Sequence, residues 1–388
     1  MSKLFITRSG FRTIWKRNGN GCCVIQTVSR STQVRFSSGN GQNVVKQSSR
    51  IKWFWMPAGF GFALISVIQL RHIQQRERRR HAPLEGVATQ SGIPPWQVNL
   101  FKVLPTRALS RFWGSVHDIE LPTVLRGPVV RLWTWAFNCC LEEAEETDPS
   151  KYKNLGEFFT RKLKQGSRDI DKNSELVSPV DGRILHFGKV TDGKLEQIKS
   201  VPYSLESFLG QSTLSNADHP TPDNQLYQCV LYLGPGDCHH FHSPAEWDIE
   251  TRRHFPGKLY SVSPWVLKGF RDVFCTNERV SLYGNWKHGI FTMTAVGAYN
   301  VGSINVHFDD ELRTNQKTGE MDKFHERKFN KSKFLGRGDH IGWFAMGSAV
   351  VLIFEGPKDF EFTVKIGQNI KLGQSLGCKR LAGRQDCC

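Results

Sequence analysis

The chain has 388 residues, of which 39% are hydrophobic and 11% aromatic. This composition is too apolar for a disordered chain, and the length excludes a single small binding module. The net charge of +16 would ordinarily indicate nucleic acid or an anionic membrane as a partner. However, residues 1–81 hold 15 Lys and Arg and one Glu, whereas residues 82–388 hold 37 basic and 35 acidic side chains. We therefore expect no nucleic-acid partner.

The first part of the chain has the features of a targeting sequence followed by a membrane anchor. Residues 1–52 contain ten basic side chains and no acidic one, which is typical of a mitochondrial transit peptide; a disordered basic tail is the alternative. Residues 53–70 carry no formal charge and would form a helix about 27 Å long, which predicts one transmembrane helix. A buried helix of a soluble domain is the alternative. Both flanks are basic, so charge predicts no orientation.

The segment after the predicted span has two parts. Residues 71–97 form a basic linker that contains several prolines. Residues 98–150 alternate apolar stretches with single basic residues, and Pro105, Pro122 and Pro128 divide them into short amphipathic helices. Such helices either cap a core or lie against a membrane surface.

From Ser178 onward the pattern is that of short strands. The runs CVLYLG, FTMTAV, NVGSINVHF and AVVLIFE are separated by Gly, Pro, Asn and Asp. This spacing predicts an α+β protein with a β-rich catalytic core of antiparallel sheets, arranged as a barrel or a sandwich, behind the N-terminal helices. The ten cysteines include no C-x-x-C, so we expect neither a disulfide framework nor a cysteine metal site.

Three segments could carry chemistry. The first, PGDCHHFHSP at residues 235–244, contains His239, His240 and His242. Imidazoles suit acid and base catalysis, and they also bind zinc, so a zinc-dependent hydrolase that uses the His239–His242 cluster is one alternative. The remaining histidines follow no ligand spacing, and a purely structural role for the cluster stays open.

The other two segments are individually weak signals. In SPVDGRIL, Asp181 precedes a glycine, which is the pattern of a turn, but a carboxylate there could also orient an imidazole. In GWFAMGSAVVLIFE, Gly347 and Ser348 precede an apolar strand. They could form a simple turn, or a strained backbone in which the Ser348 hydroxyl reaches the Gly347 carbonyl. A hydrolase serine is poorly supported because the G-x-S-x-G pattern is absent.

Taken together, these segments resemble the phosphatidylserine decarboxylase family. The matching segments run in order from about residue 151 to residue 377: YKNLGEFFTRKLKQGSR, SPVDGRIL, YLGPGDCHHFHSP, FPGKLYSVSP, NERV, VGAYNVGSI, and GS followed by VVLIFE. With a transit peptide and one span, the architecture is similar to the mitochondrial branch of the family. The resemblance implies a single-pass protein of the mitochondrial inner membrane whose catalytic body faces the intermembrane space.

The resemblance also implies a self-processing precursor. Ser348 would attack the Gly347 carbonyl and become a covalent pyruvoyl group, the only cofactor implied, with no metal. The cut would divide the catalytic domain into a β-chain portion, 151–347, and an α chain, 348–388. The pyruvoyl group would form a Schiff base with the amine of phosphatidylserine, and the products would be phosphatidylethanolamine and CO2.

Roles for the remaining residues follow from the same resemblance. His242 would act as the base for Ser348, with Asp181 orienting its imidazole, and His239 would protonate the carbanion left by CO2. His240 and Asp237 would have supporting roles at most.

The sequence departs from the family at the cleavage motif. It has Met346 and Ala349 where Leu and Thr are usual, so one possible hydrogen bond near the pyruvoyl group is lost. A non-processing, membrane-tethered pseudoenzyme or scaffold is therefore an alternative.

Overall fold

The structure, a computed structural model, describes residues 102–198, 201–210, 223–299, 303–316, 323–345 and 347–379, together with Trp96 and Asn99. The predicted transit peptide and the predicted transmembrane helix lie outside these residues. Within the described ranges, no helix is both long enough and apolar enough to cross a bilayer.

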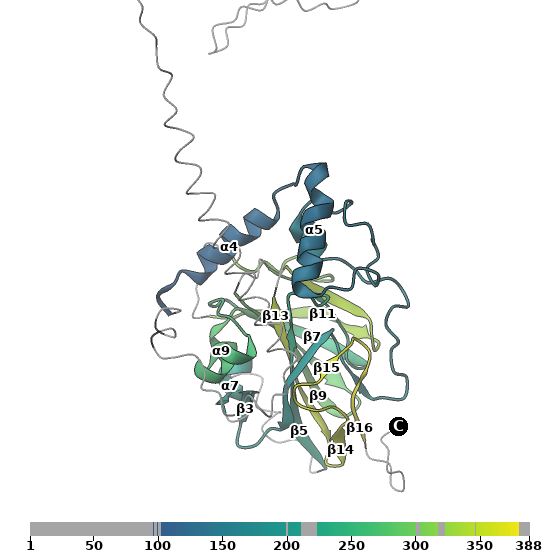
Figure 1. The fold of residues 1–388 in the computed structure, drawn as a ribbon. Helices are drawn as coiled ribbons and strands as arrows, with labels where there is room; N and C mark the ends of the chain where they lie inside the picture. The colour runs from purple at the N-terminus through teal and green to yellow at the C-terminus, as the bar shows by residue number, and fades with distance from the viewer. Residues whose placement is uncertain are drawn as a thin grey trace, which may run out of the picture. The chain divides into compact units, whose positions relative to one another are not determined.

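The main sheet has eight antiparallel strands in the order β11-β7-β8-β9-β13-β5-β2-β15 (Figure 1). The strands are β2 (Gly182–Lys189), β5 (Asn224–Leu233), β7 (Trp247–Phe255), β8 (Arg279–Trp286), β9 (Gly289–Gly297), β11 (His325–Leu335), β13 (Ser348–Pro357) and β15 (Asn369–Ile370). The strands predicted in CVLYLG, FTMTAV and AVVLIFE are confirmed as β5, β9 and β13. The β-rich, antiparallel character of the core is therefore confirmed as well.

The described residues also form three smaller sheets. One has the order β10 (Ile304–Val306), β12 (His340–Phe344) and β6 (His240–His242), and another has β1 (Leu176–Val177), β16 (Ser375–Lys379) and β14 (Phe360–Phe362). The third pairs β3 (Lys194–Ile198) with β4 (Val201–Ser204). The strand predicted in NVGSINVHF is β10.

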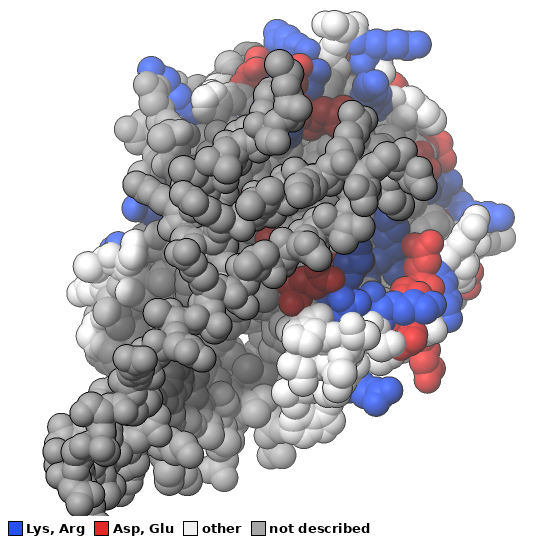
Figure 2. Space-filling model, turned by 90° about the horizontal axis from the view of Figure 1, so that it is seen from above, with Lys and Arg blue, Asp and Glu red and all other residues white. Residues whose placement is uncertain are grey.

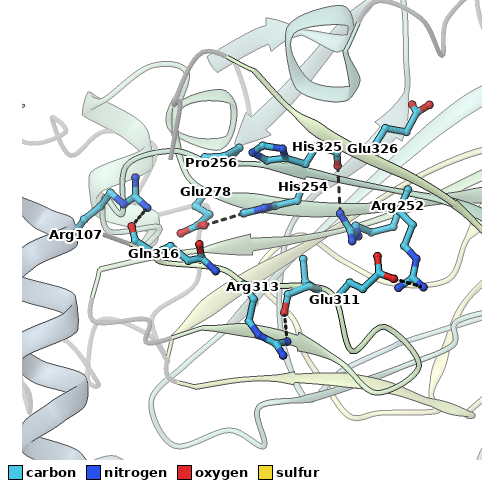
Figure 3. Close-up of a pocket in the computed structure, with 12 residues that line it drawn as sticks. Arg107, Arg252, His254, Pro256, Glu278, Glu311, Arg313, Gln316, His325 and Glu326 are labelled. Carbon is cyan, nitrogen blue, oxygen red and sulfur yellow. Dashed lines mark hydrogen bonds and ion pairs between the residues drawn. The ribbon is translucent and has the colours of Figure 1, made fainter. Parts of the chain in front are cut away.

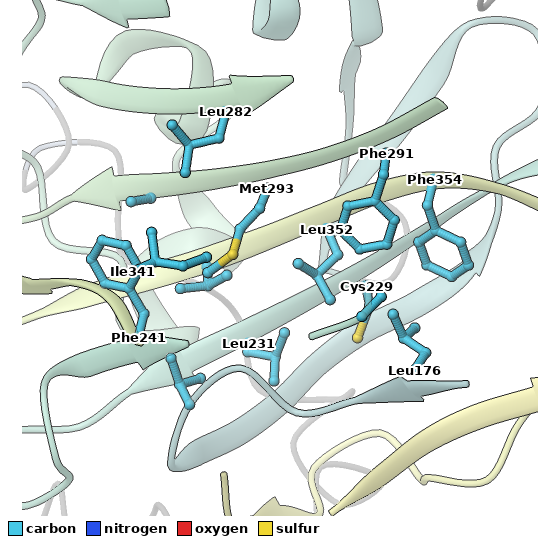
Figure 4. Packing of buried hydrophobic residues seen from close by; sticks show 14 of the residues in the cluster. Leu176, Cys229, Leu231, Phe241, Leu282, Phe291, Met293, Ile341, Leu352 and Phe354 are labelled. Atoms are coloured by element: carbon cyan, nitrogen blue, oxygen red, sulfur yellow. The ribbon is translucent and has the colours of Figure 1, made fainter. Parts of the chain in front are cut away.

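Both faces of the main sheet are covered, as expected of a sandwich. Along β13, Val350, Leu352 and Phe354 belong to a core cluster shared with the two three-stranded sheets (Figure 4). Ala349 and Val351, on the opposite face, belong to a cluster shared with the short helices α7 (Leu205–Leu209), α9 (Pro264–Gly269) and α10 (Val273–Thr276). Because side chains alternate between two buried faces, the first six residues of AVVLIFE, 349–354, are continuously apolar. Burying each large side chain contributes about 1.5–3 kcal/mol.

Between residues 106 and 159 of the described chain, the helices α4 (Thr106–His117), α5 (Thr123–Phe137) and α6 (Leu155–Phe159) precede the sheets. Pro105 and Pro122 stand directly before α4 and α5, as predicted. The prediction that Pro128 ends a helix was wrong, because Pro128 lies inside α5. A single proline removes only one backbone hydrogen bond, and burial of Val130 against Phe158 and its neighbours holds the helix together.

Charge is mixed over the folded part of the chain. Figure 2 shows Lys and Arg next to Asp and Glu on the described part of one face, without an extended field of one sign there. This agrees with the near balance of charge in residues 82–388.

Candidate active site

The predicted site residues gather at one end of the main sheet. Ser348 is the first residue of β13, and its partners are Leu233, the last residue of β5, and Gly297, the last residue of β9. Asp181 directly precedes β2, the other neighbour of β5. Because neighbouring strands are antiparallel, the starts of β13 and β2 lie beside the ends of β5 and β9. This is also the end covered by α5, since a side chain on Gly236 would collide with the Phe137 carbonyl.

The histidine loop leaves the sheet beside Ser348 and returns close to it. It starts after Leu233 and leads to β6, which pairs with β12. The backbone N–H of Phe344, at the end of β12, donates to the His239 carbonyl at 2.9 Å. Only three residues then separate Phe344 from Ser348. The topology therefore places the His239 loop and the Gly347–Ser348 bond at adjoining turns.

Ser348 is a fully buried serine whose Oγ has no hydrogen-bond partner. Its side chain lies on the same sheet face as Leu233 and Val350, which both belong to the apolar core. An unpaired buried hydroxyl costs about 1–3 kcal/mol, so packing alone does not explain it. Gly347 has a φ of +26°, in the left-handed region that favours glycine, and the nearest atom to its missing Cβ is the Tyr299 carbonyl oxygen at 3.8 Å. A hydroxyl without a partner thus follows a backbone turn that glycine permits.

His239 is held by the main chain. Its Nδ1 lies 2.8 Å from the Asp237 carbonyl oxygen. Because a carbonyl only accepts, Nδ1 carries the proton and Nε2 is the basic nitrogen of the neutral ring. The ring is fully buried, with its centroid 4.1 Å from that of Phe159 in α6. Asp237, expected to have a supporting role at most, fixes this tautomer through its backbone.

His242 is a neutral imidazole in this environment. Its backbone N–H donates to the Pro179 carbonyl at 2.9 Å, which places it beside the segment that carries Asp181. Its Nδ1 is buried and has no hydrogen-bond partner. Burial, followed by the nearby rings of His340 and His240, lowers the pKa of His242 to about 3. The ring is therefore in its base form at physiological pH, although such a low pKa makes it a weak base.

His240 and His340 form a hydrogen-bonded pair. His240 Nε2 lies 3.0 Å from the Thr160 carbonyl oxygen and must therefore donate. Its Nδ1 then accepts from His340 Nε2 at 2.8 Å. Burial, followed by the neighbouring His240, lowers the pKa of His340 to about 4. Sequence reasoning missed His340, because no spacing rule links it to a partner one hundred residues away.

Asp181 is bonded to an arginine. Its carboxylate accepts from Arg168 Nε at 3.0 Å, from Arg168 Nη2 at 2.6 Å and from the Leu372 N–H at 2.8 Å. Burial acts to raise the pKa of Asp181, but these hydrogen bonds lower the pKa by a larger amount. The carboxylate is therefore ionised. In the described structure no hydrogen bond joins Asp181 to His242, so its influence is electrostatic: its charge acts to raise the pKa of His242. Arg168, the last residue of the segment YKNLGEFFTRKLKQGSR, had no predicted role.

The described residues do not form a metal centre. No three or more His, Cys, Asp or Glu side chains among them are arranged to hold a metal ion. His239 Nδ1 and His240 Nε2 instead bond to carbonyl oxygens. The zinc alternative therefore receives no support from the geometry of the histidine cluster.

Several cavities bounded by described residues lie at this end of the molecule. One of them, about 230 Å³, is lined by Asp181, Gly234 and Asp237 and so borders the predicted site. Another, about 400 Å³, is shown in Figure 3 and contains none of the predicted site residues. Glu278 in its wall is bonded to His254 at 2.8 Å. A further cavity, about 350 Å³, is lined by Arg111 and His117 of α4, Phe159 of α6 and Ala345. Since Phe159 contacts His239 and Ala345 is two residues from Gly347, this 350 Å³ cavity also adjoins the predicted chemistry.

Comparison with known proteins identifies the family. The profile of the phosphatidylserine decarboxylase family matches residues 155–378, more than half of the chain. The chain belongs to the phosphatidylserine decarboxylase family. The matched range includes Asp181, the histidine loop, Gly347 and Ser348. The resemblance inferred from the sequence is therefore confirmed.

Relatives of this decarboxylase family cover most of the chain. The mitochondrial phosphatidylserine decarboxylase proenzyme of Pongo abelii is 45% identical over 330 residues, which is 78% of this chain and 80% of the relative. Proenzyme 1 of Schizosaccharomyces pombe is 37% identical and covers 88% of this chain and 95% of its own length. Proenzyme 1 of Saccharomyces cerevisiae is 34% identical and covers 75% of each chain.

The structure shows where Ala349, one of the two departures from the usual decarboxylase motif, lies relative to Ser348. Ala349 is fully buried and packs on the opposite face of β13 from Ser348. A threonine hydroxyl at this position would extend from that opposite face. The expected loss of a hydrogen bond near the pyruvoyl group therefore does not follow. Met346 lies outside the described residues.

Proposed function

We propose that this chain is a self-processing, pyruvoyl-dependent phosphatidylserine decarboxylase that produces phosphatidylethanolamine and CO2. The observation that carries the proposal is the buried, unpartnered Ser348 hydroxyl directly after the left-handed Gly347, at the sheet end that also holds His239 and His242. The relatives are named proenzymes, in keeping with a precursor that is cut.

Self-cleavage would begin at Ser348. Its Oγ attacks the Gly347 carbonyl carbon and passes its proton to the neutral His242, the amide C–N bond breaks, and an ester with a free amine at residue 348 results. The ionised Asp181 stabilises the imidazolium formed in this step. Loss of the α-proton of residue 348 then breaks the Cβ–Oγ bond and releases a chain that ends in the Gly347 carboxylate. Water converts the resulting dehydroalanine to a pyruvoyl group and ammonia.

The residues around position 348 fit such a group. The backbone of Ser348 is held between β5 and β9, and its β9 partner, Gly297, has no side chain on the shared face. The pyruvoyl carbonyl supplies an electron sink for the bond that breaks as CO2 leaves. His239 would hold a proton at Nε2 and deliver it to the substrate carbon, since Nδ1 is occupied by the Asp237 carbonyl.

The substrate would reach this site from a bilayer. Large apolar side chains on and around α4 and α5 are exposed to solvent: Val103, Phe112, Trp113, Val116, Ile119, Val124, Leu125, Leu132 and Trp135. Exposed large apolar side chains gathered on two neighbouring helices of the sequence are typical of a surface that lies against lipid. The 350 Å³ cavity beneath α4, with Arg111 in its wall, would then admit the anionic headgroup.

We also propose the finer location implied by the sequence. The relatives' names include mitochondria, and residues 1–52 have the composition of a transit peptide. Residues 53–70 would anchor the protein in the inner membrane, with the catalytic body in the intermembrane space. The tether would keep a nearly neutral body near its lipid substrate.

Replacement of Ser348 tests the proposal. Intact-mass measurement of the purified wild-type chain should show two chains, the smaller beginning at residue 348, whereas Ser348→Ala should remain a single full-length chain without decarboxylase activity. Ser281→Ala is the matched control, because Ser281 is equally buried and lies in β8; it should be cleaved like the wild type. Active wild-type protein that is uncut, or a cut Ser348→Ala chain, would contradict the proposal.

A further inference from the structure

Three segments that resemble the family, FPGKLYSVSP, NERV and VGAYNVGSI, meet at one side chain, that of Asn277. Asn277 is fully buried directly after α10. Its Oδ1 accepts the Tyr260 N–H at 2.9 Å. Its Nδ2 donates to the Tyr260 carbonyl and to the Gly297 carbonyl, each at 2.8 Å. The amide thus joins two separate backbone segments and uses both its donor and its acceptor groups to do so.

The segment that contains Gly297 lies against Ser348. The Gly297 N–H donates to the Glu278 carbonyl at 2.8 Å, and the Gly297 carbonyl accepts from Asn277. Both backbone polar groups of Gly297 therefore point away from β13, so Gly297 and Ser348 form a non-hydrogen-bonded pair, in which Cα atoms are about 4.5 Å apart. Asn277 consequently fixes a part of the backbone that contacts Ser348 without bonding to it.

The backbone at Tyr260 is linked through Tyr299 to Gly347. The Tyr260 carbonyl, held by Asn277, also accepts the Tyr299 N–H at 3.3 Å. The Tyr299 carbonyl oxygen is in turn the nearest atom to the Cβ position of Gly347, at 3.8 Å. Asn277 therefore connects to the backbone on both sides of the Gly347–Ser348 bond.

We propose that Asn277 is a positioning residue for self-cleavage, which holds Gly297 and Tyr299 so that the Ser348 hydroxyl meets the Gly347 carbonyl. The inference rests on the proposed function. Attack requires the reacting atoms to approach within about 3–3.5 Å, and a misplacement of about 1 Å can slow a reaction about a hundredfold. Ser348 Oγ has no hydrogen-bond partner of its own, so the surrounding backbone must define its position.

The test is Asn277→Asp in the full-length chain. Aspartate has almost the same shape and can still accept from Tyr260, but it cannot donate to the two carbonyls. We expect the first-order rate of cleavage, measured by mass on the folded fraction, to fall by at least about tenfold, equivalent to about 1.4 kcal/mol in the barrier. Thr294→Val is the control, because it removes a buried hydrogen bond between Thr294 in β9 and Ser281 in β8 but does not change Gly297. This variant should be cleaved within about twofold of the wild-type rate.

A second measurement separates positioning from general stability. Hydroxylamine cleaves esters and leaves amides intact, so a brief pulse reports how much ester has formed. Asn277→Asp should show less trapped ester than wild type, because the first step is the slow one, whereas a variant that is only less stable should trap a normal amount per folded molecule. Wild-type levels of ester, or cleavage at the Thr294→Val rate, would overturn the inference.

A second variant keeps the inference testable if Asn277→Asp does not fold. A Cβ on Gly297 would lie 3.1 Å from the Glu278 carbonyl oxygen and 3.1 Å from Leu259 Cδ2, so Gly297→Ala shifts the same backbone while Asn277 stays. It should also slow ester formation by at least about tenfold; normal ester formation would overturn the inference. Failure of the proposed function is distinguishable, because the wild-type chain would then not be cut at all.

Discussion

At the scale of single residues, the relation between Asp181 and His242 is the main revision. Sequence reasoning expected Asp181 to orient the imidazole of His242. In the structure its carboxylate bonds to Arg168 and the Leu372 N–H and acts on His242 through charge. Arg168 thus keeps a buried acid ionised near His242, and the charge of this acid partly opposes the burial that lowers the pKa of His242.

This relation predicts a pH-dependent defect in Arg168→Gln. Without the guanidinium, only the Leu372 N–H and the Lys371 ammonium oppose burial, so we expect the pKa of Asp181 to rise and its carboxylate to lose charge more readily as the pH falls. Self-cleavage should therefore be slower than in the wild type and should decline further between pH 8 and pH 5.5. In the wild type the lowered pKa of Asp181 keeps this group ionised throughout that range.

The check is the cleavage rate as a function of pH for wild type, Arg168→Gln and Asp181→Asn. Asp181→Asn should block cleavage at every pH, because no charge remains to support His242. A flat pH profile for Arg168→Gln, or normal cleavage of Asp181→Asn, would show that the pair has only a structural role.

The residues of the candidate site could be proposed from sequence where they lie in short motifs. Gly347, Ser348, Asp181 and the histidines each stand in a recognisable segment. Arg168 and His340 were not predictable, because their roles depend on contacts with residues that are distant in the sequence. The tautomer of His239 is likewise a property of the folded loop, set by the Asp237 carbonyl.

At the scale of secondary-structure elements, the buried strands were predictable and the exposed strand was not. β5, β9 and β13 are buried on both faces and consist mostly of apolar residues, so their composition identifies them. β11 is an edge strand rich in Lys and Arg, a composition that discourages pairing with other chains and hides the strand from hydrophobic patterns. The extent of α5 was missed because Pro128 indicates a break that packing overrides.

The exposed faces of α4 and α5 lead to a prediction about substrate presentation. Phe112 and Trp135 are 66% and 64% exposed. In the double variant Phe112→Glu, Trp135→Glu we expect the KM for phosphatidylserine in vesicles to rise by about tenfold or more, since two large apolar contacts with lipid are lost. Activity on a water-soluble, short-chain phosphatidylserine should stay near the wild-type level.

The matched control is Phe334→Glu. Phe334 is also 66% exposed, but it pairs with Asp248 near the start of β7, away from the sheet end that carries Ser348. This variant should leave both activities unchanged. An equal effect of Phe334→Glu, or loss of activity on the soluble substrate in the double variant, would contradict a specific role for α4 and α5 at the membrane.

At the scale of the whole molecule, the histidine cluster makes stability depend on pH. The pKa of His242 is about 3 and that of His340 about 4 in the folded chain, whereas an ordinary histidine has a pKa near 6.5. Between these values the unfolded chain binds more protons, so the free energy of unfolding falls as the pH drops. For His242 alone the loss at pH 5 is on the order of 1–2 kcal/mol.

Thermal unfolding of Ser348→Ala, chosen because it should remain one chain, checks this prediction. Its midpoint should be clearly lower at pH 5 than at pH 7.5. Adding His340→Gln should lower the midpoint at pH 7.5 but reduce the further drop on acidification, because one buried neutral histidine is removed. An unchanged drop would show that other groups cause the acid sensitivity.

The position of β13 has a consequence for the mature protein. A cut before Ser348 leaves this strand hydrogen-bonded to β5 on one side and β9 on the other, and β16 remains between β1 and β14. The short C-terminal chain would thus be interwoven with the long one through the centre of the main sheet, and its strands β15 and β16 would also pair with β2 and β1 of the long chain. The two chains could separate only by unfolding together, and once apart they could not restore the consumed serine. If the chain is cut before Ser348, each molecule makes its reactive group once, and we expect slow opening of the shared sheet to limit its working lifetime.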